Sequence, residues 1–229
     1  MNLLELARRL KSESGRSGSG PVSVSSAIDN DLRIVNAVRD CWLDLQLEPR
    51  NWRFMRKSLS GKSLSEGVGE YSQSSFGVTD VASWWHETSD YQPRVCQASA
   101  PQSEWPLGWL PYERFASMFL VGQPDNGVPQ YWSQGLDGKL LIGPKPDATP
   151  YLLRIDYVRE PTALTGDTDS PDMPTRFHMF LVWEALKSVA ITDASNENLA
   201  RAADRAASLY DALCADQAEP ITFAHRPLA

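Results

Sequence analysis

The longest amphipathic segment of this sequence predicts a helix that needs a partner. Its apolar residues recur every three or four positions, as one face of an α-helix requires, and they are Ile28, Leu32, Val35, Val38, Trp42 and Leu45. About 20 residues at ~1.5 Å each form a rod of roughly 30 Å. Each apolar side chain gains about 1.5–3 kcal/mol on burial. The fold must therefore pack other elements on this rod. Ser26 or Asp29 is expected to cap it and Pro49 to end or kink it.

Three further segments show the helical period. One is a short amphipathic helix from Asn2 to about Ser12. The next is expected to start at Asp172-Met173-Pro174, and it is apolar around more than half of its circumference. Such a helix lies at the centre of its domain or between subunits. The last is capped by Ser195, and its stripe is rich in alanine, which allows a neighbouring backbone to approach closely.

Short alternating runs replace the helical period between about residues 54 and 161. Residues 130–133 and 139–143 flank a glycine-containing turn and predict a hairpin. Residues 151–158 predict a further strand, and residues 111–120 a short helix with proline in its first turn. Evenly spaced short strands favour a small antiparallel sheet or a sandwich.

These patterns together predict an α+β fold. A helical bundle is built from the N- and C-terminal segments, with an inserted antiparallel β domain and an extended C-terminal arm. We expect the bundle to comprise residues 1–53 and 172–216, the β-rich insertion residues 54–171, and the arm residues 217–229.

Charge and cysteine content narrow the function classes. The chain of 229 residues has 22 basic and 29 acidic side chains, so its net charge is −7. Such a chain has no overall field that would hold nucleic acid or an anionic membrane. No transmembrane segment or signal peptide is predicted. Cys41, Cys96 and Cys214 are far apart, which argues against a disulfide framework or a zinc site. We expect a soluble protein made and kept inside a cell.

The sequence predicts no catalytic residue, no cofactor and no metal. His86, His178 and His225 lack metal-binding spacing, and His178 lies in an apolar helix, where a structural role is expected. The glycine-rich run 15–20 lacks the Lys-Ser/Thr pair of a phosphate-binding loop and is followed by Pro21.

Tryptophan is unusually frequent, and five of the eight lie in the predicted insertion: Trp84, Trp85, Trp105, Trp109 and Trp132. Aromatic rings displayed on loops stack on sugars or anchor an interface. The alternative is that a small β domain uses them as its core, and the sequence favours neither. Five carboxylates of the same region could supply a pair for glycoside hydrolysis, although solvated loop side chains explain them better: Glu66, Glu70, Glu87, Glu104 and Glu113.

The order of elements resembles the head-to-tail adaptor proteins of tailed bacteriophages. The resemblance is carried by Leu3–Leu10 with the following Glu13–Pro21, by Asn51–Arg56, by Pro129–Trp132, by Leu140–Asp147, by Tyr157–Leu164 and by Met173–His178. These landmarks extend over most of the chain, and the segment 80–123 departs from the family pattern because it is long and rich in tryptophan.

The resemblance implies a structural virion protein without enzymatic activity. Members form a ring, typically of twelve subunits, that docks under the portal protein in the neck between head and tail. The ring extends the DNA channel and offers a surface to the next tail component, which is a nozzle, a stopper or the tail tube. DNA would pass an acidic lumen without specific binding. Assembly is expected in the host cytoplasm, with no membrane involved.

Three sets of contact residues follow from this interpretation. The apolar arm is expected to bind the portal protein through Ile221, Phe223, His225, Arg226 and Leu228. Subunits are expected to meet at Phe180, Trp183 and Tyr210, and the tail component at Trp84, Trp85, Trp105 and Trp109. The alternative function is a phage-associated glycan hydrolase or a carbohydrate-binding tail module that uses the tryptophan-rich insertion.

Overall fold

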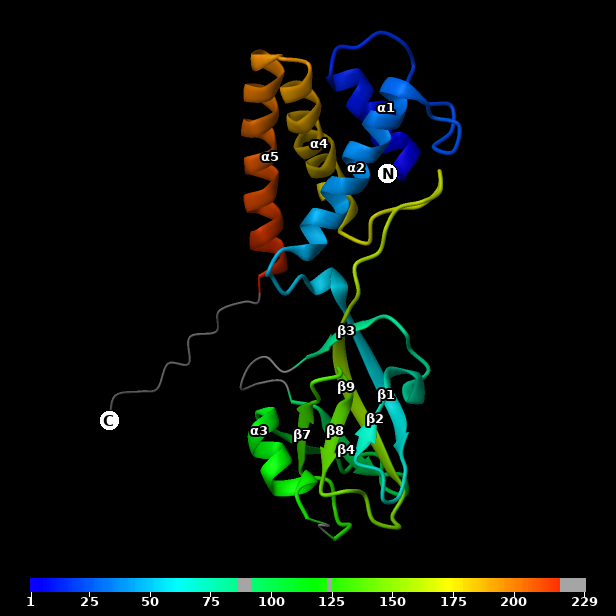
Figure 1. The fold of residues 1–229 in the computed structure, drawn as a ribbon, viewed down its shortest axis with the longest axis vertical. Helices are drawn as coiled ribbons and strands as arrows, with labels where there is room; N and C mark the ends of the chain where they lie inside the picture. The colour runs from blue at the N-terminus through cyan, green and yellow to red at the C-terminus, as the bar shows by residue number, and fades with distance from the viewer. Residues whose placement is uncertain (86–91, 123–124, 219–229) are drawn as a thin grey trace, which may run out of the picture. The chain divides into compact units, whose positions relative to one another are not determined.

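The chain folds into two compact units. The computed structural model describes residues 1–85, 92–122 and 125–218 and has an α+β architecture (Figure 1). The helical unit comprises Met1–Met55 and Pro161–Ala229, and the β unit comprises Arg56–Glu160. The segment 161–171, assigned to the β insertion from the sequence, therefore belongs to the helical unit.

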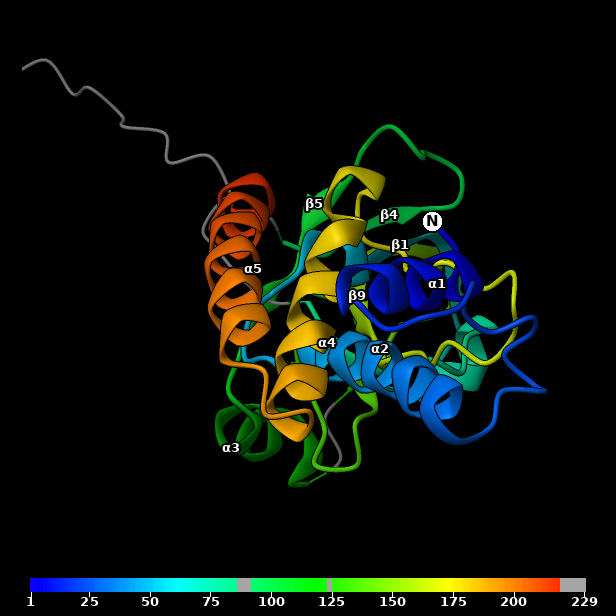
Figure 2. The same ribbon diagram turned by 90° about the horizontal axis from the view of Figure 1, so that it is seen from above.

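The helical unit is built around its most apolar helix. It contains α1 (Leu3–Glu13), α2 (Asp29–Leu47), α4 (His178–Thr192) and α5 (Asn196–Gln217), with short 3₁₀ turns at Arg53–Met55 and Thr175–Phe177. Helix α4 packs against each of the other three, and it lies between α2 and α5 (Figure 2). Most of its circumference is buried, because Phe180, Leu181 and Val182 follow one another in the core, while Glu184 and Lys187 are half-buried. Of the two places expected for this helix, the centre of its domain is confirmed.

The predicted stripe of α2 is confirmed over most of its length. Val35, Val38, Trp42 and Leu45 are buried. Ile28 and Leu32 are not, with 72% and 40% of their surface exposed. Ile28 precedes the first turn of the helix. At about 100° per residue, each three-residue step falls about 60° short of a full turn, so the stripe drifts around the helix and Leu32 lies at its edge. This part of the prediction is wrong.

Helix ends were predicted less well than helix faces. Helix α1 has a capping box, in which Asn2 Oδ1 accepts from the Glu5 amide at 2.9 Å and the Glu5 carboxylate accepts from the Asn2 amide at 3.0 Å. Helix α2 has Ile28 at its N-cap, with no side-chain cap, so neither expected capping residue is used. Ser195 is the N-cap of α5, but its side chain makes no capping bond. Helix α4 begins at His178, after the 3₁₀ turn, and not at Pro174.

His178 joins the start of α4 to the N-terminal residue. Its Nδ1 lies 2.8 Å from the Met1 amino nitrogen, and its Nε2 lies 3.1 Å from the Met173 carbonyl oxygen. A neutral ring accepts at Nδ1 and donates at Nε2, which fits both partners. Burial lowers the pKa of His178, and the positive charge of the Met1 amino group lowers it further. The side chain is 3% exposed and forms part of the structural core.

Lowering the pH from 7 to 5 is expected to destabilise the helical unit through His178. Its pKa is lowered in the folded chain, so the unfolded chain takes up the proton first, and the free energy of unfolding falls as the pH drops below about 6.5. Carboxylates with a lowered pKa, such as Asp169, lose their contribution only nearer pH 4. Urea unfolding between pH 7.5 and 5, followed by circular dichroism at 222 nm, measures this slope. His178→Gln should flatten it, and equal slopes in both proteins would refute the assignment.

The β unit consists of two facing sheets. In the first sheet the order is β1 (Arg56–Leu64), β9 (Tyr151–Arg159), β4 (Arg94–Gln97) and β5 (Trp105–Pro106), and β3 (Val81–Trp84) also pairs with β9. In the second the order is β2 (Glu70–Tyr71), β8 (Leu140–Gly143), β7 (Tyr131–Gln134) and β6 (Gly108–Trp109). The predicted hairpin is β7–β8 and the predicted strand 151–158 is β9, so both are confirmed. Among the strand pairs within the described residues, β6–β7 is parallel and all the others are antiparallel.

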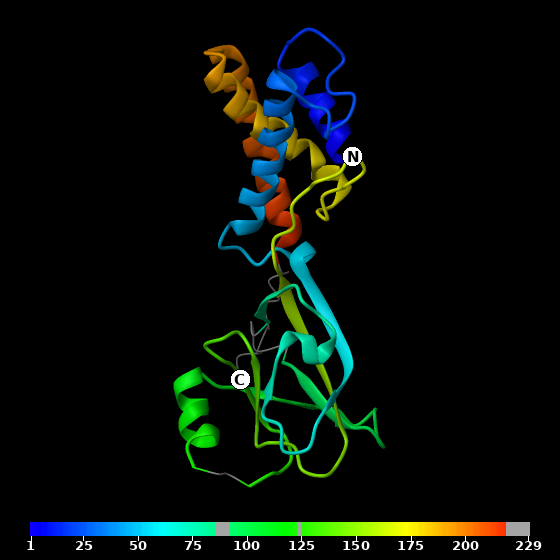
Figure 3. The same ribbon diagram turned by 45° about the vertical axis from the view of Figure 1, so that its right-hand side comes forward.

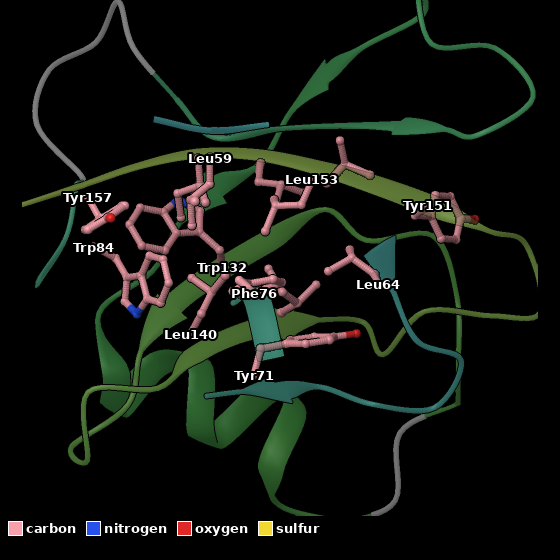
Figure 4. Close-up of a cluster of buried hydrophobic side chains, with 14 of the residues drawn as sticks. Leu59, Leu64, Tyr71, Phe76, Trp84, Trp132, Leu140, Tyr151, Leu153 and Tyr157 are labelled. Atoms are coloured by element: carbon pink, nitrogen blue, oxygen red, sulfur yellow. The ribbon is translucent and has the colours of Figure 1, made fainter. Parts of the chain in front are cut away.

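One hydrophobic core lies between the two sheets (Figure 4). Strand β9 contributes Leu153, Ile155 and Tyr157 from one face, as its alternation predicts, and Trp132 and Leu140 face them from the second sheet. The arrangement is a β-sandwich, in which side chains from two inner faces interdigitate.

The predicted short helix covers the outer face of the second sheet. Helix α3 (Tyr112–Phe115) continues into a π-helical turn (Ala116–Leu120), and it stands beside β7 (Figures 1 and 3). Phe115 packs on Leu141, whose side chain points away from the sandwich core. Strand β8 is therefore buried on both faces, which explains its unbroken apolar run.

Candidate interaction surfaces

A groove with one acidic wall runs along one side of α5. Its floor is α4 and its walls are α2 and α5, and its volume is about 330 Å³. Alanines Ala203, Ala206 and Ala207 line the wall from α5. Asp44 and Glu48 line the wall from α2. We call this hollow the acidic groove.

Charges in the acidic groove are mostly negative. Glu184 and Lys187 of its floor form an ion pair at 2.6 Å, and Glu48 lies 3.9 Å from Arg50, which leaves Asp44 as the unpaired charge of the lining. The Tyr210 hydroxyl donates to Glu48 Oε2 at 2.7 Å. Burial and this bond to Glu48 raise the pKa of Tyr210 to about 12. Asp44 is exposed and makes no ion pair within the described ranges.

Cys41 lines the same groove from α2. Burial raises the pKa of its thiol to about 12, with further contributions from the negative charges of Glu184, Asp44 and Asp40. Because the thiolate is the nucleophile, a thiol in this environment is inert at neutral pH. Cys41 is therefore no candidate for catalysis.

Alkylation of Cys41 by iodoacetamide at pH 8 is expected to be very slow. With a pKa of about 12 its thiolate fraction makes it on the order of a thousand times less reactive than an ordinary thiol of pKa 8.5. Asp44→Asn should accelerate the reaction, because it removes a negative charge that opposes ionisation. Peptide mapping by mass spectrometry measures the rate at this cysteine, with glutathione as the reference. Labelling of Cys41 as fast as glutathione would contradict the groove's electrostatics.

A second hollow lies on the other side of α5 and is basic. It has a volume of about 530 Å³ and is lined by Glu13, Trp183, Arg201, Arg205, Ser208 and Leu209. The Glu13 carboxylate is held by Arg9 at 2.6 Å and lies 3.9 Å from Arg201. The Arg201 guanidinium lies 5.5 Å from the Trp183 ring centroid. Arg205 is exposed and has no ion pair in the part of the chain that the structure describes. We call this hollow the arginine hollow.

The structure places the three predicted subunit-interface residues on these two hollows. Phe180 and Tyr210 line the acidic groove with ring centroids 5.7 Å apart, and Trp183 lines the arginine hollow. Phe180 is buried, whereas Trp183 and Tyr210 are half-buried. Sequence reasoning found these residues from helical apolarity, but it missed the arginines beside them, because arginines at helical spacing are equally expected on a solvated face.

Two of the four tryptophans predicted to meet a tail component are buried in the β unit. Trp84 is 1% exposed in the sandwich core, and its Nε1 donates to the Gly138 carbonyl at 3.0 Å. Trp85 is buried with the Arg56 guanidinium 4.8 Å from its ring centroid. Neither ring is displayed, so the core interpretation holds for both, as it does for Trp132. A contact of either with a tail component stays a prediction.

The other two tryptophans lie nearer the surface. Trp105 is half-buried, stacks edge-on against Tyr151 at 6.0 Å, and donates from Nε1 to the Pro129 carbonyl at 2.9 Å. Trp109 is 46% exposed. Sequence reasoning missed a further apolar surface at the end of α3, where Met118, Leu120 and Val121 are exposed. The apolar run 118–121 at the end of a short helix was the available signal.

The carboxylates considered for glycoside hydrolysis occupy ordinary surface positions. Glu70 lies 3.8 Å from Lys139 and Glu104 lies 3.4 Å from Arg154. Glu66 and Glu113 are exposed. Glu87 lies outside the described residues.

Several predicted features fall on residues that the structure does not describe. The five residues predicted to bind the portal protein, Ile221, Phe223, His225, Arg226 and Leu228, lie outside the described residues, as does His86. Within the described ranges, no group of three or more histidine, cysteine, aspartate or glutamate side chains could hold a metal ion. No helix in the same ranges is long and apolar enough to cross a membrane.

Comparison with known proteins places the chain in a family. The search of curated proteins found no match. A family model described as SU10 adaptor protein matches residues 1–226, which includes the whole β unit and all the helices of the helical unit. The resemblance drawn from the sequence is thereby confirmed. The chain belongs to the SU10 adaptor protein family, a family of structural adaptor proteins of bacteriophages.

Proposed function

We propose that this protein is a head-to-tail adaptor that forms a ring under the portal protein and connects the capsid to the tail. The observation that carries the proposal is the family match, because it extends over residues 1–226 and not over one unit alone. A structural adaptor needs surfaces for several partners and no reactive pocket. The helical unit offers two hollows along α5, and the β unit exposes Trp109 and the end of α3.

The helical unit is the part that we expect to form the ring, with twelve copies as the expected number. Phe180, Trp183 and Tyr210 line its two hollows. Ala203 and Ala207 on the exposed surface of α5 allow another copy to approach closely. A net charge of −7, repeated around a ring, gives a negative channel that does not retain DNA, because phosphate binding requires cations on the protein.

The two ends of the connection use different segments. The arm 217–229 binds the portal protein, because an apolar segment with Ile221, Phe223 and Leu228 fits a groove better than open solvent. The β unit faces the next tail component, and Trp105 and Trp109 are the better candidates of the four predicted tryptophans because they lie nearer the surface.

Deletion of Pro220–Ala229 tests the portal contact. Helix α5 ends at Gln217, so the truncated protein should keep the helical content and thermal stability of the full chain. Its co-purification with portal protein should be lost. A second variant, with Ile221, Phe223 and Leu228 replaced by serine in the full-length chain, should lose portal binding like the deletion, because the contact is apolar. Undiminished portal binding by both variants would remove the arm from the proposal.

A further inference from the structure

The two hollows of the helical unit flank the same helix and carry opposite charge. The acidic groove is lined by Ala203, Ala207 and Tyr210 from α5, and the arginine hollow by Arg201 and Arg205. Each set repeats every three or four residues, so each occupies its own side of the helix. Helix α5 therefore separates a hollow whose unpaired acidic residue lies on α2 from a hollow whose arginines are its own.

We propose that the acidic groove of one copy binds the basic flank of α5 of a second copy. The inference rests on the proposed ring and specifies its contact: Arg205 of one copy enters the groove and pairs with Asp44 of the next. The two surfaces differ, so the contact is heterologous and each added copy leaves one groove and one basic flank open. Such a contact gives a ring when the rotation between copies closes, and it does not give a symmetric pair.

Charge complementarity is the reason for choosing a second copy as the occupant. Asp44 and Arg205 are exposed, opposite in charge and without ion pairs in the described parts of the chain. An arginine side chain also has an apolar stem that can cover the alanine wall of the groove. Arginine, tyrosine and tryptophan are the residues that most often anchor interfaces, and Tyr210 and Trp183 lie at the two surfaces.

The test uses two charge reversals, one on each surface. Asp44→Arg reverses the charge in the groove and leaves the basic flank intact, whereas Arg205→Glu reverses the charge on the flank and leaves the groove intact. Sedimentation velocity over a concentration series at ~50 mM salt, where screening is weak, measures self-association. The wild-type protein should associate with increasing concentration. Each single variant should raise the dissociation constant at least tenfold.

Mixing the variants tests the direction of the contact. An equimolar mixture offers a native pair, Asp44 of one variant with Arg205 of the other, and a charge-reversed pair, so it should associate more strongly than either variant alone. The double variant carries both reversals in one chain and should recover part of the association. A symmetric contact through one surface alone would instead let the variant that keeps that surface associate by itself, with no gain on mixing. Glu66→Arg and Arg114→Glu, exposed residues of the β unit, are the matched controls and should associate like wild type.

The outcomes separate this inference from the proposed function. If wild type associates and the reversals change nothing, the assigned surfaces are wrong, while the proposed ring stands. If wild type stays monomeric at every concentration, the inference also fails, and portal co-purification still tests the adaptor function independently. If removing residues 219–229 abolishes association as completely as Asp44→Arg, the occupant of the groove is the C-terminal segment, and the inference is overturned.

Discussion

Trp42→Ala is expected to lower the free energy of unfolding of the helical unit by about 3–5 kcal/mol. Trp42 is fully buried on α2, and its ring stacks on Phe54 at 5.8 Å. Its Nε1 donates to the Thr162 carbonyl at 2.7 Å, and Gln46 bonds both the carbonyl and the amide of the same residue. The substitution removes the largest side chain of the α2 stripe and loosens the point where the chain returns to the helical unit.

Two controls separate the causes of that loss. Trp42→Phe keeps most of the packing and removes the bond to Thr162, so it should cost about 1–3 kcal/mol. Ile28→Ala, at a residue that is 72% exposed, should stay within about 0.5 kcal/mol of wild type. Urea unfolding followed at 222 nm measures all three. Equal effects of Trp42→Ala and Ile28→Ala would mean that the α2 stripe does not carry the helical core.

The pair Trp84→Ala and Trp109→Ala is expected to separate stability from recognition in the β unit. Trp84→Ala should cost about 3–5 kcal/mol, because it empties part of the sandwich core and removes the bond to Gly138. Since 1.4 kcal/mol is a factor of ten, amide exchange in β9 should become more than a hundred times faster. Trp109→Ala should change that exchange little, because its ring is half exposed.

Binding to a purified tail component completes this comparison. Trp109→Ala should weaken the binding while amide exchange in β9 stays like wild type. Undiminished binding of Trp109→Ala would remove this residue from the proposed tail contact. A substitution at Trp84 cannot be used in the same way, because a loss of binding would follow from the loss of the fold.

Local patterns of the sequence predicted most of the elements. The helical period located α2 and α4, and alternation located β9, because these patterns depend only on which face of an element is buried. The two runs around a glycine-containing turn located β7 and β8. Helix ends were harder, since Asp29 adopts a positive φ of 48° and α2 starts without a side-chain cap. Nothing in the residues before α2 indicates this conformation.

The surfaces could be predicted only in part. A tryptophan pair such as Trp84-Trp85 occurs both in cores and at interfaces, so the sequence pattern does not distinguish the two. Trp84 is buried because the second sheet packs against it. The arginine hollow brings Glu13 of α1 against Arg201 of α5, residues that are far apart in the sequence. Such charge arrangements depend on how helices pack, so no sequence motif predicts them.

The mass of the assembly formed with portal protein tests the adaptor account most directly. Native mass spectrometry of the chain alone, of the portal ring alone and of their mixture gives the number of copies bound. The account predicts one discrete complex with many copies of this chain on each portal ring, twelve being the expected number. No complex, or a complex with a single copy on each portal ring, would contradict it.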